Sequence, residues 1–174
     1  MTAPFRLEPL GPSHERGGFT CGAAVLDQYL ASQASQDVRR RVSACYVALE
    51  VDSGRVAGFY TLAAGSVPLS DLPAELTRRL PRYPAVAVAR IGRLAIDRAF
   101  QGQKLGGALL ADAALRAARS EVAVFALIVD AKDEAASAFY RHHGFEPVGG
   151  NERQLFIPIQ RFRSLPARLS ASAR

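Results

Sequence analysis

Cysteine and histidine are scarce in this chain, and their scarcity narrows the chemistry it can perform. Two cysteines and three histidines occur in 174 residues. Cys21 and Cys45 have neither a CxxC spacing nor nearby histidines, so we expect two free thiols and predict no disulfide and no metal site. The histidines lie in a loop and at a predicted helix end, which leaves no Ser-His-Asp arrangement for nucleophilic catalysis.

Long apolar runs and a leader-like N-terminus are also lacking. No run of about 18 apolar residues occurs, and the first residues have neither the basic nor the apolar region of a secretion signal. We therefore expect no membrane association and a cytoplasmic protein. With 49% hydrophobic and 22% charged residues, the chain suits one domain, which we place at 1–160. The composition of the basic tail, 161–174, favours disorder.

Positive charge is plentiful and almost all of it is arginine. The formal net charge is +6, and only Lys104 and Lys132 are lysines. Arginine suits phosphate and planar partners. A genome rich in G and C would give the same excess as a nucleic-acid surface, so the positions of the arginines matter more than their number.

Hydrophobic periodicity predicts a mixed α/β fold with about six to seven strands in one sheet and helices on both faces. The first half is expected to contain a strand at 5–10, a helix with Leu26, Tyr29, Leu30 and Ala34 on one face, a hairpin of strands 43–51 and 55–64, and a short helix capped by Ser70. A central strand ending at Leu94–Ile96, a helix after 105 and a buried strand at 122–129 follow. The last elements are a helix capped by Asp130 or Asp133 and ended by a left-handed Gly144, and strands from Phe145 and at 154–159. Pro158 makes the last of these an edge strand.

The stretch from Arg93 to Leu110 reads as strand, glycine turn and helix. Glycine lets the backbone approach a ligand closely, and the following helix points its unpaired N–H groups and positive dipole end into the turn. Such a turn binds phosphate, whereas a tight packing turn is the minority alternative. Neither a G-x-G-x-x-G nor a G-x-x-x-x-G-K-[ST] pattern is present.

The sequence Q-G-Q-K-L-G from Gln101 to Gly106 resembles the R/Q-x-x-G-x-G/A acetyl-CoA loop of the GNAT acetyltransferases. Lys104 stands where that family prefers glycine, so it must tolerate the local backbone angles and adds a cation near the pyrophosphate. The segment from Ala138 to Phe145 resembles the family's A-x-x-F-Y-x-x-x-G-F element, whose tyrosine lies near the thioester sulfur. The resemblance implies the GNAT fold, with its fourth and fifth strands splayed around acetyl-CoA.

A narrower resemblance links residues 19–146 to the acetyltransferase toxins of type II toxin–antitoxin modules. It is carried by Phe19-x-Cys21-Gly22, Leu26-Asp27, Tyr29-Leu30, Gly58-Phe59-Tyr60-Thr61-Leu62, Leu80-Pro81-Arg82-Tyr83-Pro84, Gly92-Arg93-Leu94-Ala95-Ile96-Asp97 and Val129-Asp130-Ala131-Lys132. Those toxins acetylate the α-amino group of aminoacyl-tRNA and block translation. The resemblance implies a ribbon-helix-helix antitoxin as partner and a homodimer.

The same resemblance assigns roles to individual residues. Tyr140 is the candidate catalytic residue, as a general acid or hydrogen-bond donor to the leaving sulfur, although its residue type alone fits packing beside Phe139 and Phe145. A backbone N–H near Leu94–Ile96 is the candidate oxyanion donor. Acetyl-CoA contacts are expected from Leu94, Ala95, Ile96, Gln101, Gly102, Gln103, Lys104, Leu105, Gly106, Gly107, Asp130, Ala135 and Phe139.

Arginines supply the candidate contacts to the tRNA backbone. They are Arg39, Arg40, Arg78, Arg79, Arg82, Arg90 and Arg93, and a solvated charged face is the alternative for the group. For Arg93, a salt bridge to Asp97 or Asp112 is about as well supported as a phosphate contact.

Two alternative functions stay open. The acceptor amine could belong to a protein N-terminus, a polyamine or an antibiotic, although a site ringed by arginine repels cationic acceptors. The chain could also be a non-catalytic protein that binds CoA or nucleic acid, which the departure at Lys104 would suit.

Overall fold

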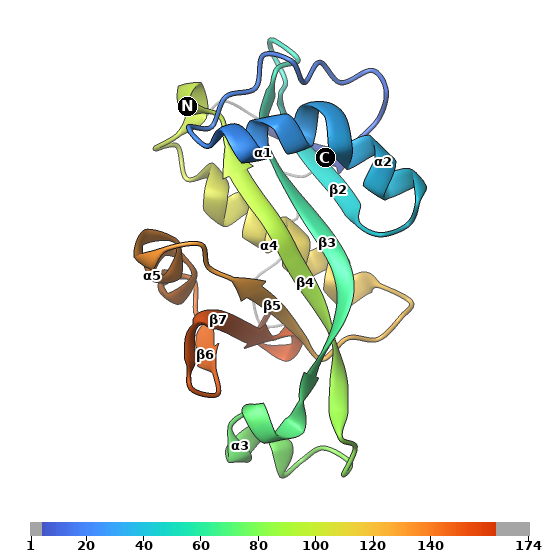
Figure 1. Cartoon of the computed structure of the whole chain (residues 1–174), viewed down its shortest axis with the longest axis vertical. Coiled ribbons are helices and arrows are strands. Elements are labelled where there is room, and N and C mark those ends of the chain that lie inside the picture. The colour runs from blue at the N-terminus through green and yellow to red at the C-terminus, as the bar shows by residue number, and fades with distance from the viewer. Residues whose placement is uncertain (1–4, 163–174) are drawn as a thin grey trace. The chain divides into compact units, whose positions relative to one another are not determined.

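A seven-stranded mixed sheet, with strand order β1-β2-β3-β4-β5-β7-β6, runs through residues 5–162, which the computed structural model describes (Figure 1). The chain divides into two compact units. Among the described residues, the first contains 5–63 together with 92–113, and the second contains 64–91 and 114–162. Strands β3 (Val56–Pro68) and β4 (Ala85–Ile96) and helix α4 (Leu105–Arg119) have residues in both. The sheet with its helices confirms the predicted fold class, whereas a single domain at 1–160 stays a prediction.

The first unit contains the predicted antiparallel strands. Strand β1 (Phe5–Pro9) pairs with β2 (Ala44–Glu50), and β2 pairs with β3 as the expected hairpin. The helix predicted before the hairpin is divided into α1 (Ala24–Gln28), a π-helical turn (Tyr29–Gln33) and α2 (Ala34–Arg39).

The core of this unit lies between those helices and the hairpin (Figure 1). Phe59 on β3 forms its centre, with ring centroids 5.5 Å from Phe19 and 6.3 Å from Tyr29. Leu30 and Ala34 are fully buried beside them, which confirms the predicted apolar face. Burial of such side chains supplies most of the driving force for folding.

The second unit contains the parallel pair of strands. Strand β4 and β5 (Ala126–Asp130) are parallel, with Val88 opposite Ala126 and Ile91 opposite Val129. The splaying of these strands stays a prediction. The other elements are a 3-10 turn (Leu69–Asp71), α3 (Ala74–Thr77), α5 (Glu134–His142), β6 (Glu146–Val148), β7 (Asn151–Pro158) and a 3-10 turn (Ile159–Phe162).

The buried strand beside β4 is confirmed as β5 but begins later than predicted, and the predicted edge position of the last strand is wrong. The apolar run 122–129 is a strand only from Ala126, and Val122 is 73% exposed. Strand β7 lies between β5 and β6, so it is not an edge strand. Pro158 is tolerated inside the sheet because it is the last residue of β7, and the next residue, Ile159, donates its N–H to the carbonyl of Phe125 at 2.9 Å.

Helix ends were predicted with mixed success. Ser70 does not cap α3, because it lies within the preceding 3-10 turn and Pro73 occupies the N-cap position. Asp133 caps α5 by accepting the N–H of Ala136 at 2.8 Å. Gly144 takes a φ of 95°, which confirms the left-handed end of that helix.

The remaining predictions concern the thiols and the tail. Cys21 and Cys45 are free, as predicted. Most of the predicted tail, 163–174, lies outside the described residues. None of the helices that the structure describes is both long and apolar enough to cross a membrane.

Candidate active site

The glycine turn lies between β4 and α4, in the first unit. Gln101, Gly102, Gln103 and Lys104 are all exposed, and a Cβ at Gly102 would point into open space. Gly102 has a φ of 82° and Lys104 a φ of 62°, so both take left-handed conformations. The carbonyl of Lys104 accepts an N–H of α4 at 3.4 Å from Ala108. The amides before that bond stand at the helix N-terminus, where such groups lack intrahelical partners.

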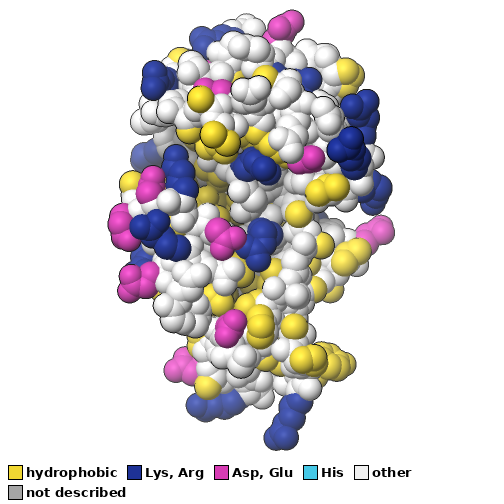
Figure 2. All heavy atoms as spheres, viewed as in Figure 1, with side chains coloured by type: hydrophobic (Ala, Val, Ile, Leu, Met, Phe, Trp, Pro, Cys, Tyr) yellow, Lys and Arg dark blue, Asp and Glu magenta, His cyan; other side chains and the backbone are white. Residues whose placement is uncertain are grey.

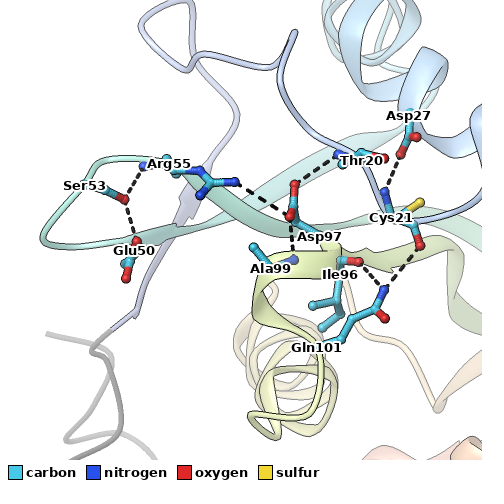
Figure 3. Close-up of polar contacts among 10 residues, drawn as sticks. All are labelled: Thr20, Cys21, Asp27, Glu50, Ser53, Arg55, Ile96, Asp97, Ala99 and Gln101. Atoms are coloured by element: carbon cyan, nitrogen blue, oxygen red, sulfur yellow. Dashed lines mark hydrogen bonds and ion pairs between the residues drawn. The ribbon is translucent and has the colours of Figure 1, made fainter.

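Asp97 fixes the start of the turn (Figure 3). Its carboxylate is 2% exposed, and it accepts N–H groups from Ala99 at 2.9 Å and from Thr20 at 3.0 Å. The guanidinium of Arg55 lies 3.8 Å from the same carboxylate. Hydrogen bonds that a carboxylate accepts from backbone amides are stronger than bonds between neutral groups, so Asp97 holds the end of β4 to the segment before α1.

Gln101 makes a second link to that segment (Figure 3). Its side-chain amide donates to the carbonyl of Ile96 at 3.0 Å and to that of Cys21 at 3.2 Å. The side chain therefore braces the turn, while its main chain stays available to a ligand.

Two residues of β3 shape the sheet beneath the turn. A Cβ at Gly58 would lie 3.1 Å from the carbonyl oxygen of Ala95 and 3.3 Å from Leu109, so glycine allows α4 to approach the sheet. The hydroxyl of Thr61, 1% exposed, accepts the N–H of Arg93 at 3.0 Å. A side-chain oxygen thus binds the amide just before Leu94, the first residue of the candidate oxyanion segment.

Tyr140 lies on α5, in the second unit. Its ring makes edge contacts with Phe139 and Phe145 at centroid distances of 5.2 and 5.4 Å. The packing alternative is thus real for the ring, which is 6% exposed.

The hydroxyl of Tyr140 is not accounted for by packing. It forms no hydrogen bond within residues 5–162, whereas every fully buried side-chain oxygen or nitrogen in that range has a partner. The oxygen therefore retains access to solvent. Burial of the ring raises the pKa of Tyr140 to about 12, so the phenol stays protonated at neutral pH and acts as a donor.

The predicted site arginines differ in their surroundings. Arg90 pairs with Asp130 at 2.5 Å, so a candidate tRNA contact and a candidate cofactor contact neutralise each other. Arg93 forms neither predicted salt bridge; its guanidinium lies 3.6 Å from the ring centroid of Tyr29, as a cation–π contact. The other five are exposed and have no carboxylate partner among the described residues: Arg39 and Arg40 at the end of α2, and Arg78, Arg79 and Arg82 around α3.

Comparison with known proteins identifies the domain. A sequence model of the family described as Acetyltransferase (GNAT) domain matches residues 41–147. The chain belongs to the GNAT acetyltransferase family. A protein of Mycobacterium tuberculosis named "tRNA-acetylating toxin" is 40% identical over 149 residues, which are 84% of this chain and 87% of the relative.

Two solved structures of the toxin AtaT resemble this GNAT domain. AtaT complexed with acetyl-methionyl-tRNA matches with a TM-score of 0.83 and 29% identity, over 91% of this chain and 97% of AtaT. An AtaT mutant bound to acetyl-CoA and to the C-terminus of the antitoxin AtaR matches with a TM-score of 0.75 and 28% identity, over 92% and 96%.

As a GNAT acetyltransferase, the protein takes its acetyl group from acetyl-CoA. The turn fits that cosubstrate, because a Cβ at Gly102 would meet no other atom within 4 Å and the side chain of Gln101 is bonded to the carbonyls of Ile96 and Cys21. The main-chain amides from Gln101 to Gly107 are the groups that would hold its phosphates. Among residues 5–162, no cluster of His, Cys, Asp and Glu is arranged to hold a metal ion.

The predicted site residues belong to both units of the GNAT domain. Leu94–Ile96 and Gln101–Gly107 lie in the first, and Asp130, Ala135, Phe139 and Tyr140 in the second, so the alignment of the sulfur with the phenol stays a prediction. Sequence reasoning missed the anchoring roles of Asp97 and Thr61. The polar side chain of Thr61 within an apolar strand was the available signal for it.

Proposed function

We propose that this protein transfers the acetyl group of acetyl-CoA to the α-amino group of an aminoacyl-tRNA, and that it thereby acts as a toxin that blocks translation. The names of its relatives support the proposal, because one is a tRNA-acetylating toxin and the structure of another is a complex with an acetylated aminoacyl-tRNA.

The observation that carries the proposal is a group of unpaired arginines on an acetyltransferase domain. Arg78, Arg79 and Arg82 are exposed, and none pairs with a carboxylate in the described part of the chain. Free guanidinium groups attract the phosphates of a nucleic acid and repel cationic amines. They favour charged tRNA over a polyamine or an aminoglycoside as the acceptor.

The acceptor amine needs little help to react. An α-amine has an unperturbed pKa of about 7.7–8.0, so a sizeable fraction is uncharged and nucleophilic at neutral pH. The proposal therefore requires no strong enzymic base; a water or a backbone carbonyl can take the proton.

The protein's contribution is to orient the reactants and stabilise charge. Attack on the thioester carbonyl builds negative charge on oxygen, for which a backbone N–H near Leu94–Ile96 is the proposed donor. Charge then develops on the leaving sulfur. With a pKa of about 12, Tyr140 is a weaker acid than a thiol, whose pKa is about 8.5, so it donates a hydrogen bond to the sulfur and does not have to surrender its proton.

The proposed biological setting follows from the substrate. Charged tRNA and acetyl-CoA meet in the cytoplasm, so we place the activity there. The complex of AtaT with the C-terminus of AtaR supports an antitoxin partner for this chain, and we propose one of the ribbon-helix-helix class. A homodimer remains part of the proposal.

Labelled acetyl-CoA would test the acceptor. The protein is incubated with separate pools of charged tRNA, peptides with free N-termini, and small amines. Label should appear in the charged tRNA and be released as N-acetyl amino acid after mild base treatment of the ester. Deacylated tRNA is the matched control and should stay unlabelled.

Two results would contradict the proposal. Label found only on peptides or small amines would assign the protein another acceptor. Binding of acetyl-CoA without transfer to any pool would support a non-catalytic protein.

A further inference from the structure

Tyr83, in the loop between α3 and β4, is displayed on the surface. Its side chain is 63% exposed, and it is the only exposed aromatic residue in the range 5–161. Its ring makes no aromatic or cation–π contact and its hydroxyl no hydrogen bond within that range. The fold therefore leaves most of this side chain in solvent, with no aromatic ring or cation against it.

The loop holds Tyr83 in place. Pro81 and Pro84 flank the residue closely, and proline fixes the backbone φ angle. The N–H of Tyr83 donates to the carbonyl of Pro81 at 2.8 Å, and the carbonyl of Pro84 accepts the N–H of Leu69 at 3.1 Å. A ring on such a braced backbone loses little conformational entropy when it binds a partner.

The charges around the ring have one sign. Arg82 precedes Tyr83 directly, and Arg78 and Arg79 lie earlier in the same loop segment. All three are exposed, and none forms an ion pair with Asp71 or Glu75, the acidic residues upstream. Figure 2 shows dark-blue side chains beside yellow ones in the region where Figure 1 labels α3.

We propose that Tyr83 is a stacking platform for an unpaired base of the RNA substrate, with Arg78, Arg79 and Arg82 on the adjoining phosphates. Proteins bind single-stranded nucleic acid by combining aromatic rings, on which bases stack, with cations that follow the backbone. The choice of RNA rests on the proposed function. The acceptor end of a tRNA carries unpaired nucleotides next to the aminoacyl ester, and one of their bases can stack on the Tyr83 ring.

The absence of tryptophan from the chain gives a direct test. In the full-length Tyr83→Trp variant the new indole is the only one, and stacking on a base quenches its emission. The variant is titrated with a single-stranded RNA hexanucleotide ending in CCA, and with a blunt duplex of the same composition as the matched control. The single strand should quench strongly and the duplex weakly.

Affinity measurements separate stacking from charge. Tyr83→Ala should weaken binding of the single strand about tenfold with an unchanged salt dependence, and Tyr83→Phe should bind like the wild type. Arg82→Ala should instead lower the slope of log K against log salt by about 0.7. None of these changes should alter the affinity for acetyl-CoA, because the residues lie outside the glycine turn.

Several outcomes would overturn the proposal. Equal quenching by the duplex, or wild-type affinity in Tyr83→Ala, would show that the ring does not stack on a base. Quenching by a poly-glutamate peptide and not by RNA would assign the loop to an acidic protein partner. Failure of the proposed function is distinguishable, because label on peptides alone would contradict charged tRNA as acceptor whatever the indole reports.

Discussion

Replacing Lys104 with glycine should stabilise the protein and lower its affinity for acetyl-CoA. The φ of 62° at Lys104 is a left-handed conformation, which costs an L-residue roughly 1–2 kcal/mol. Its cation also stands before the N-terminus of α4, an unfavourable position worth about 0.3–1 kcal/mol. Glycine removes both costs but adds roughly 0.5–1 kcal/mol of backbone entropy to the unfolded chain.

The net gain from Lys104→Gly is about 1 kcal/mol, which raises Tm by roughly 2–4 °C for a chain of this size. Calorimetry with acetyl-CoA should show the opposite trend. Loss of one charge-assisted contact to phosphate increases Kd about threefold to tenfold and reduces its dependence on salt.

Arg41→Gly is the matched control. Arg41 has a φ of 58° and follows α2, where its N–H donates to the carbonyl of Val38 at 3.1 Å. The substitution relieves the same kind of strain, although it also removes a cation that favours a helix C-terminus, so a smaller gain in Tm is expected. Its affinity for acetyl-CoA should match that of the wild type. A lower Tm in Lys104→Gly would refute the strain argument, and an unchanged Kd would refute the phosphate contact.

Three further predictions concern other parts of the site. Tyr140→Phe should reduce kcat about 100-fold or more. Its Tm should be nearly unchanged, because the hydroxyl has no partner within residues 5–162. Wild-type activity should rise with pH to about 8 and stay level to about 10, because the pKa of Tyr140 is about 12; activity that falls between pH 8 and 10 would count against the phenol as donor. Arg82→Glu should raise KM for charged tRNA and flatten its salt dependence while the Kd for acetyl-CoA holds; equal loss of both would indicate misfolding. Asp97→Ala should lower the free energy of unfolding by about 3–5 kcal/mol in urea titrations, because Thr20 and Ala99 lose a buried charged acceptor; a loss below about 1 kcal/mol would show that water replaces the carboxylate.

The sequence predicted best those features that are encoded locally. The segments 43–51 and 55–64, rich in strand-favouring and apolar residues, form the predicted hairpin, and the glycine turn lies between a strand and a helix as expected. Asp133 and Gly144 were recognised because a cap depends on residues only a few positions away.

Contacts between residues distant in sequence were not predictable. The pairing of Arg90 with Asp130 joins neighbouring parallel strands, and Gln101 bonds to Cys21, 80 positions earlier in the chain. Strand β7 entered the sheet between β5 and β6 because strand order depends on tertiary packing, which the position of Pro158 does not determine.

Asp97 accepts a hydrogen bond from Thr20, and Gln101 donates one to Cys21 (Figure 3). These two bonds connect the glycine turn mechanically to the segment before α1. Ordering either part must slow amide exchange in the other. If a molecule that binds the segment before α1 changes the affinity for acetyl-CoA by some factor, thermodynamic linkage requires that acetyl-CoA change the affinity for that molecule by the same factor.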